Sequence, residues 1–121
     1  MGCKKIYLTN RTIEKAENIK NKFEEVEILK WGEIPNFDIV INATSVGLKG
    51  DSLDLVFNVK DKIFYDVIYN PKETQFLKEA KKNGNKTENG KFMFIYQANQ
   101  SFSIWNNVIP KIDDEVLKIL E

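Results

Sequence analysis

The stretch KKIYLTNRT, residues 4–12, indicates how the whole chain is organised. Its apolar run, Ile6, Tyr7 and Leu8, is typical of a short β-strand, and the polar residues that follow lead directly into a helical pattern. In an open α/β sheet, ligands bind in the crevice beyond the carboxyl ends of the strands. The sequence therefore predicts that Arg11 lies at a ligand site at the end of the first strand.

The polar residues after this strand indicate which ligand the site takes. A dinucleotide fold that prefers NAD usually has an acidic residue at the end of its second strand, where it binds the ribose 2′-hydroxyl, whereas an NADP site needs a cation there. This chain has Asn10, Arg11 and Thr12 in that place, with Lys15 one helical turn further on. Because a guanidinium can hold a phosphate through two parallel charge-assisted hydrogen bonds, we predict a 2′-phosphate site. The alternative is a solvated arginine that merely follows a strand.

Apolar periodicity predicts an alternation of strands and helices along the chain. Strands are expected at residues 6–9, 26–31, from 37 onward and at 62–69, and helices at residues 12–23, 70–82, 91–105 and from 113 onward. This alternation indicates an α/β fold with a truncated Rossmann-like, mostly parallel sheet flanked by helices. The length of 121 residues suits a single domain that spans residues 1–121. Trp31 and Trp105 are expected to anchor its core.

The second of these helices carries a clear start signal. Asn70 can cap the helix, Pro71 suits its first position, and Glu73 completes a capping box. The sequence therefore predicts a helix that begins at Pro71 and ends before the turn at residues 83–84.

Composition limits the functions that the chain can have. Its 18 basic and 18 acidic residues balance, so no overall field favours nucleic acid or an anionic membrane. The chain has no histidine and one cysteine, Cys3, which excludes imidazole catalysis, a zinc site and an internal disulfide. No apolar run approaches the roughly 20 residues that cross a bilayer. We therefore expect a cytoplasmic protein with no metal site, which binds neither nucleic acid nor membranes.

Four segments, in order and with similar spacing, resemble the cofactor-binding domain of shikimate dehydrogenases. They are NRT at residues 10–12, INATSVGL at 41–48, YDVIYNPKETQFL at 65–77 and NGKFMFIYQANQSFSIW at 89–105. The resemblance covers nearly the entire chain and implies NADP-dependent, reversible reduction of 3-dehydroshikimate to shikimate, on the route to aromatic amino acids. It also implies that the sequence begins at the family's second Rossmann strand. The first strand, its glycine-rich loop and the catalytic substrate domain, with its lysine and aspartate pair, are then missing.

The resemblance also implies roles for two groups of residues. Those that bind the cofactor, from its 2′-phosphate to its nicotinamide end, would be Asn10, Arg11, Thr12, Lys15, Asn42, Ala43, Thr44, Ser45, Val67 and Gly90. Contacts to shikimate would come from Tyr69 and Gln97. A glycine at Gly90 makes physical sense because a backbone approaches the nicotinamide ring closely only where no Cβ intervenes. No catalytic residue is expected in this chain.

Several of these roles have a simpler alternative in the residues alone. Asn42 could merely cap its loop, and Tyr69 could be a packed aromatic residue of the core or rim. Gln97 lies in an apolar helix, where a buried amide needs partners that a ligand would supply. Asp66 is interpreted as structural.

The missing first strand has further consequences. The strands at residues 6–9 and 38–41 would have unpaired edges in the middle of the sheet, so we expect either direct pairing between them or an intertwined homo-oligomer, with the second favoured. The chain alone should bind NADPH weakly, because the pyrophosphate cradle is absent, and should show no turnover. Two alternatives remain open: a non-catalytic nucleotide-binding or assembly module, and a relative that acts on quinate or uses NAD.

Overall fold

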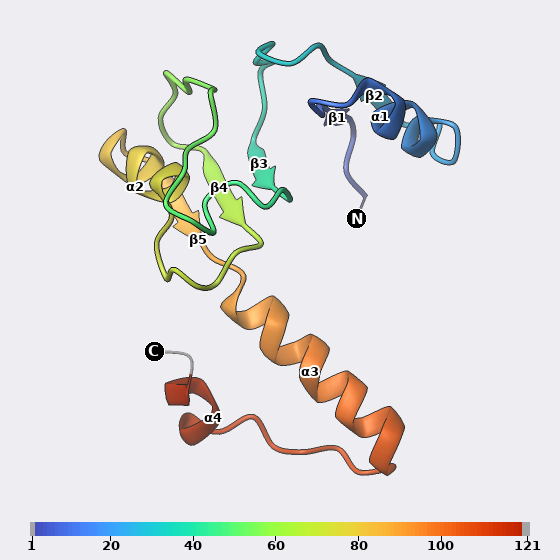
Figure 1. The fold of residues 1–121 in the computed structure, drawn as a ribbon, viewed down its shortest axis with the longest axis vertical. Helices are drawn as coiled ribbons and strands as arrows, with labels where there is room; N and C mark the ends of the chain where they lie inside the picture. Colours follow the sequence, from blue (N-terminus) through green and yellow to red (C-terminus); the bar gives the residue numbers. More distant parts are fainter. Residues whose placement is uncertain (1, 120–121) are drawn as a thin grey trace. The chain divides into compact units, whose positions relative to one another are not determined.

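The computed structural model describes residues 2–119 of the chain. These residues form two compact units, which divide between Asn36 and Phe37 (Figure 1). Both units contain parallel strands and helices, and each is described by itself below.

The first unit is a single β–α–β motif. Strand β1, Ile6–Leu8, runs parallel to β2, Val26–Ile28, and helix α1, Ile13–Lys20, connects the two. Ala16 on the helix and Val26 on β2 are buried and form its small core. Helix α1 ends earlier than the sequence predicts: the N–H groups of Lys22 and Phe23 donate to carbonyls three residues back, as in a turn, rather than four.

The second unit contains a three-stranded parallel sheet in the order β3-β4-β5. Its strands are β3, Ile39–Asn42; β4, Ile63–Asp66; and β5, Lys86–Glu88. Its helices are α2, Gln75–Lys82; α3, Lys91–Asn106; and α4, Asp114–Ile119. Helix α2 connects β4 to β5, as a parallel pair of strands requires.

Aromatic side chains between α2 and the sheet form the core of this unit. Phe64 of β4 is 1% exposed and packs against Phe76 of α2, with their ring centroids 5.2 Å apart. Phe37 and Phe57 meet Phe64 edge to face, at centroid distances of 6.0 and 5.3 Å. Each such aromatic pair stabilises the fold by about 0.5–1.5 kcal/mol beyond the area it buries. The cluster therefore fixes α2 and the segment before β4 on the same face of the sheet.

Helix α2 begins at Gln75 rather than at Pro71, so the predicted start of this helix is wrong. Thr74 is the N-cap residue, but its hydroxyl makes no capping hydrogen bond. It donates instead to Oδ2 of the buried Asp66, at 2.6 Å, and the backbone N–H of Ile68 donates to Oδ1 of the same carboxylate, at 3.0 Å. This tertiary network holds the segment before Gln75 in a loop and overrides the local capping signal.

Each of the two sheets, taken by itself, matches a part of the Rossmann strand order. Strand β1 pairs with β2, and β3 pairs with β4. In the order 3-2-1-4-5-6, β1 and β2 correspond to the second and third strands, and β3, β4 and β5 to the fourth, fifth and sixth. The predicted truncated Rossmann-like α/β class is confirmed.

Neither tryptophan is a core anchor, so this expectation is wrong. The side chain of Trp31 is 39% exposed and that of Trp105 is 82% exposed. Trp105 lies in the last turn of α3, whereas the buried residue of that helix, Ile95, lies near its start. Apolar residues at helical spacing indicate that a helix has an apolar face. They do not indicate which neighbouring element, if any, covers that face.

We predict that Thr74→Val lowers the free energy of unfolding by about 1–3 kcal/mol, because it leaves an oxygen of the buried Asp66 without its donor. The measurement is denaturant unfolding followed by circular dichroism. Thr87→Val on β5 is the matched control, since the Thr87 hydroxyl takes no part in the Asp66 network. Equal destabilisation by the two variants would contradict this role of Asp66.

Candidate functional site

Cationic side chains without protein partners follow β1. Arg11 and Lys15 are exposed, and within residues 2–119 neither side chain takes part in a hydrogen bond or ion pair. The side-chain amide of Asn10 donates to the carbonyl of Thr12, at 2.7 Å, and so shapes the turn into α1. Thr12 is the N-cap residue of α1, yet its hydroxyl makes no capping bond. The end of β1 thus offers two free cations beside a helix start whose hydroxyl is free.

A buried hydroxyl adjoins this turn. Oγ1 of Thr9 is shielded from solvent and has no hydrogen-bond partner among the described residues. Leaving such a group unsatisfied costs about 1–3 kcal/mol, so its position fits a partner that these residues do not supply. An unsatisfied hydroxyl, two free cations and the N-terminus of α1 are the groups that suit a phosphate-bearing ligand.

The side chain of Asn42 shapes the loop after β3. Its Nδ2 donates to the carbonyl of Val46 at 3.0 Å and to Oδ1 of Asp66 at 3.2 Å. Its Oδ1 accepts from the backbone N–H and the hydroxyl of Thr44, at 3.1 and 2.8 Å. These four bonds use the full capacity of a primary amide, so the simpler alternative of a loop-shaping Asn42 describes its side chain well. Ala43 and Ser45, on either side of Thr44, are exposed.

The residue at position 90 must be a glycine because the backbone of Val67 leaves no space for a side chain there. A Cβ at this position would lie 2.0 Å from the carbonyl oxygen of Val67, far closer than non-bonded atoms approach. The N–H of Gly90 donates to the carbonyl of Ile68 at 3.1 Å, and the amide of Asn89 donates to the carbonyl of Lys72 at 2.8 Å. The backbone of Gly90 thus closely approaches that of Val67, whereas its approach to the nicotinamide ring stays a prediction. These contacts fasten the start of α3 to the loop after β4.

The residues expected to contact shikimate lie on these two fastened segments. Tyr69 is half-buried in the loop after β4, and its ring stacks on Phe94 in the first turns of α3, with centroids 4.5 Å apart. Gln97 lies about one turn further along α3 and is exposed. The expectation of a buried amide at Gln97 is therefore wrong, because no described residue covers this part of the helix.

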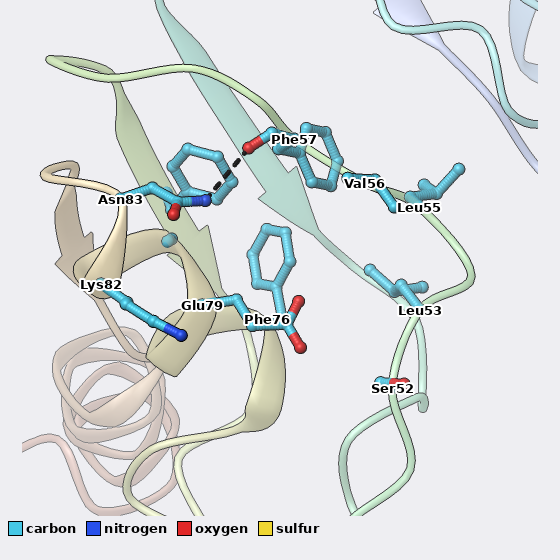
Figure 2. Close-up of a pocket in the computed structure, with 11 residues that line it drawn as sticks. Ser52, Leu53, Leu55, Val56, Phe57, Phe76, Glu79, Lys82 and Asn83 are labelled. Carbon is cyan, nitrogen blue, oxygen red and sulfur yellow. Dashed lines mark hydrogen bonds between the residues drawn. The ribbon is translucent and has the colours of Figure 1, made fainter.

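A separate cavity of about 210 Å³ lies between the segment at residues 52–57 and α2 (Figure 2). Phe57 and Phe76 line it, and the side-chain amide of Asn83 donates to the carbonyl of Phe57 at 3.3 Å. None of the candidate residues at the strand ends lines this cavity. It belongs to the packing of α2 rather than to the candidate site.

Two further findings concern the described residues as a whole. Within residues 2–119, no three His, Cys, Asp or Glu side chains gather into a group that could hold a metal ion. None of the helices in this range combines the length and the apolar character needed to cross a bilayer.

Comparison with known proteins identifies the relatives of the chain, although no family model matches it. The chain is 55% identical over 120 residues to the NADP-dependent shikimate dehydrogenase of Pelagibacter ubique, an alignment that covers 97% of this chain and 45% of that protein. The chain is homologous to part of the shikimate dehydrogenases. The resemblance inferred from four short segments is therefore confirmed.

Solved structures agree with this homology. A shikimate dehydrogenase in complex with NADP+ is 40% identical, has a TM-score of 0.76, and is matched over 96% of this chain and 45% of that one. The enzyme from Listeria monocytogenes, solved with shikimate and NAD, is 27% identical with a TM-score of 0.83, over 99% of this chain and 48% of that one. The chain thus spans about half the length of the relatives it matches.

We predict that Gly90→Ala destabilises the second unit by about 3 kcal/mol or more, since the added Cβ meets the Val67 backbone, which cannot move aside like a flexible side chain. Denaturant unfolding measures the effect. Gly2→Ala is the control, because a Cβ at Gly2 meets nothing within 4 Å. A Gly90→Ala variant as stable as the Gly2→Ala variant would show that the backbones of Gly90 and Val67 are not in contact.

Proposed function

We propose that this chain is the cofactor-binding part of an oxidoreductase that reversibly reduces 3-dehydroshikimate to shikimate with NADPH, in the biosynthesis of aromatic amino acids. The observation that supports this most directly is the pair of free, exposed cations, Arg11 and Lys15, at the end of β1. They stand in a chain that is 55% identical to an NADP-dependent shikimate dehydrogenase. A cation near the ribose, in place of an acidic residue, is what distinguishes an NADP site from an NAD site.

The residues proposed to bind the cofactor are found in both units, and each group is considered by itself. In the first unit, the guanidinium of Arg11 would hold the 2′-phosphate through two parallel hydrogen bonds, and Lys15 would add a positive charge without such a paired contact. The helix start and the two remaining polar side chains, Asn10 and Thr12, complete this end. The second unit would contact the cofactor through the loop after β3, the loop after β4 and the start of α3. The residues proposed there are Asn42, Ala43, Thr44, Ser45, Val67 and Gly90.

The chemistry of hydride transfer belongs to the nicotinamide cofactor, and the residues of this chain bind and orient it. Tyr69 and Gln97 are proposed to contact shikimate, the first through its phenol hydroxyl and the second through its amide. Because Gln97 is exposed and its side chain has no partner among the described residues, it is free to bind a polyhydroxylated substrate. We assign no proton-transfer step to any residue of this chain.

The 121 residues are proposed to form one cofactor-binding domain of a cytoplasmic enzyme, and by themselves to bind NADPH weakly and to turn over no substrate. The single, exposed Cys3 suits a reducing compartment. The sequence contains no glycine-rich turn next to β1 to hold the pyrophosphate, so much of the usual affinity is missing.

We further propose that these 121 residues, when isolated, associate through the strands β1 and β3. Within residues 2–119 each of them pairs with only one neighbour, and an unpaired strand edge is a template for another chain. Light scattering over a range of concentrations is expected to show a dimer or larger species. A strictly monomeric chain at high concentration would exclude this association.

The test of the proposed activity is a fusion protein in which this chain is joined to the part of the Pelagibacter ubique relative that lies outside the aligned region. We expect the fusion to oxidise shikimate with NADP. Arg11→Ala should raise the KM for NADP about tenfold and leave the KM for NAD unchanged, because only NADP loses a charge-assisted contact worth about 1.5 kcal/mol.

Two variants control this experiment. Lys22→Ala removes an exposed cation outside the candidate site and should change neither KM. Arg11→Lys keeps the positive charge but cannot form two parallel hydrogen bonds to a phosphate. Its KM for NADP should therefore lie between those of the parent and Arg11→Ala. A fusion that is folded but shows no shikimate turnover would refute the proposed activity, and equal losses for NADP and NAD would refute the role of Arg11.

A further inference from the structure

The contact between Tyr69 and Phe94 is the ring stack that joins the loop after β4 to helix α3. The two rings are 4.5 Å apart between centroids and inclined by 25°, which is a stacked arrangement. Phe94 remains 38% exposed and Tyr69 is only half-buried. Neither ring belongs to the buried cluster around Phe64 that forms the core of this unit. The stack therefore stands apart from the core, beside the residues proposed to bind substrate.

Phe94 and Gln97 lie close together on helix α3. The two residues are three positions apart on α3, so their side chains leave the same face of the helix. The start of α3 is held by the hydrogen bond from the N–H of Gly90 to the carbonyl of Ile68, at 3.1 Å. A ring stacked on Phe94 is thus placed relative to Gln97 by the rigid helix between them.

We propose that Phe94 is a positioning residue for the substrate site: its ring holds the phenol of Tyr69 in one orientation and so sets the spacing between the Tyr69 hydroxyl and the Gln97 amide. This inference rests on the proposed function, since it assigns Tyr69 and Gln97 to shikimate. Phe94 itself touches neither substrate nor cofactor. It acts through the tyrosine ring on which it stacks.

The physical basis is the rotamer freedom of a half-buried tyrosine. Without a ring to stack on, the side chain of Tyr69 can occupy up to three staggered χ1 positions, of which one places the hydroxyl correctly. A ligand that needs a state populated about one-third of the time binds about threefold more weakly. Because the hydroxyl contact is expected to be equally strong in the bound substrate and in the transition state, the loss appears in KM and leaves kcat unchanged.

The test uses the fusion protein described above and the variant Phe94→Leu. We expect the KM for shikimate to rise about threefold, with kcat and the KM for NADP unchanged. Phe92→Leu is the matched control, because it makes the same change on an exposed phenylalanine of α3 that has no ring partner among the described residues. Phe94→Tyr keeps a stacking ring and should retain the parent KM.

A double-mutant cycle distinguishes positioning from a general structural role. Tyr69→Phe keeps the stacked ring but removes the hydroxyl, so in this background Phe94→Leu should have no further effect on the KM for shikimate. In the isolated chain, the ring-proton NMR signals of Tyr69 should move toward their free-peptide positions in Phe94→Leu and remain in place in Phe92→Leu.

The possible outcomes separate this inference from the proposed function. An active parent in which Phe94→Leu leaves the KM for shikimate unchanged, or raises it equally with and without the Tyr69 hydroxyl, overturns the role of Phe94 alone. A folded parent without shikimate turnover overturns the proposed function, and the role of Phe94 falls with it. An active parent with a threefold effect that vanishes in the Tyr69→Phe background supports both.

Discussion

The carboxylate of Asp66 is the group on which the arrangement of the second unit depends. It is fully buried at the end of β4, where an unpaired carboxylate would be very costly. The hydroxyl of Thr74, the backbone N–H of Ile68 and the amide of Asn42 all donate to it. These donors come from the start of α2, the loop after β4 and the end of β3. One side chain therefore fixes the three segments that surround the carboxyl ends of the two strands.

The fixed loop after β4 then determines where α3 begins. Its carbonyl at Val67 leaves no room for a side chain at Gly90, and its carbonyl at Ile68 accepts the N–H of the same glycine. The first turns of α3 are held by these backbone contacts and by the stack of Tyr69 on Phe94. The position of the helix start thus follows from the buried network at Asp66, one segment away, and not from the propensity of the helix itself.

The sequence was informative where local patterns decide the structure. The apolar runs predicted strands β1 to β4 in their correct order, and the polar residues after β1 predicted exposed cations at a strand end. It failed where tertiary contacts decide. The capping signal at Asn70 predicted a helix from Pro71, but the helix begins at Gln75 because the hydroxyl of Thr74 donates to Asp66. A single sequence does not reveal this contact. Likewise the spacing of α3 could not show that Trp105 stays exposed, because burial depends on a neighbour and not on the helix.

Ion pairs make some of the chain's lysines less suited to an anion than Arg11, which fits the proposed site at the end of β1. Lys5 is held by Glu27 at 2.6 Å and Lys81 by Glu73 at 3.5 Å, so an anion that approached either lysine would have to compete with a carboxylate. Arg11 has no such competitor among the described residues. In a chain whose charges balance overall, selectivity for a phosphate cannot come from a global field. It must come from a local cation that the fold leaves unpaired, and such an exposed contact should weaken as salt screens it.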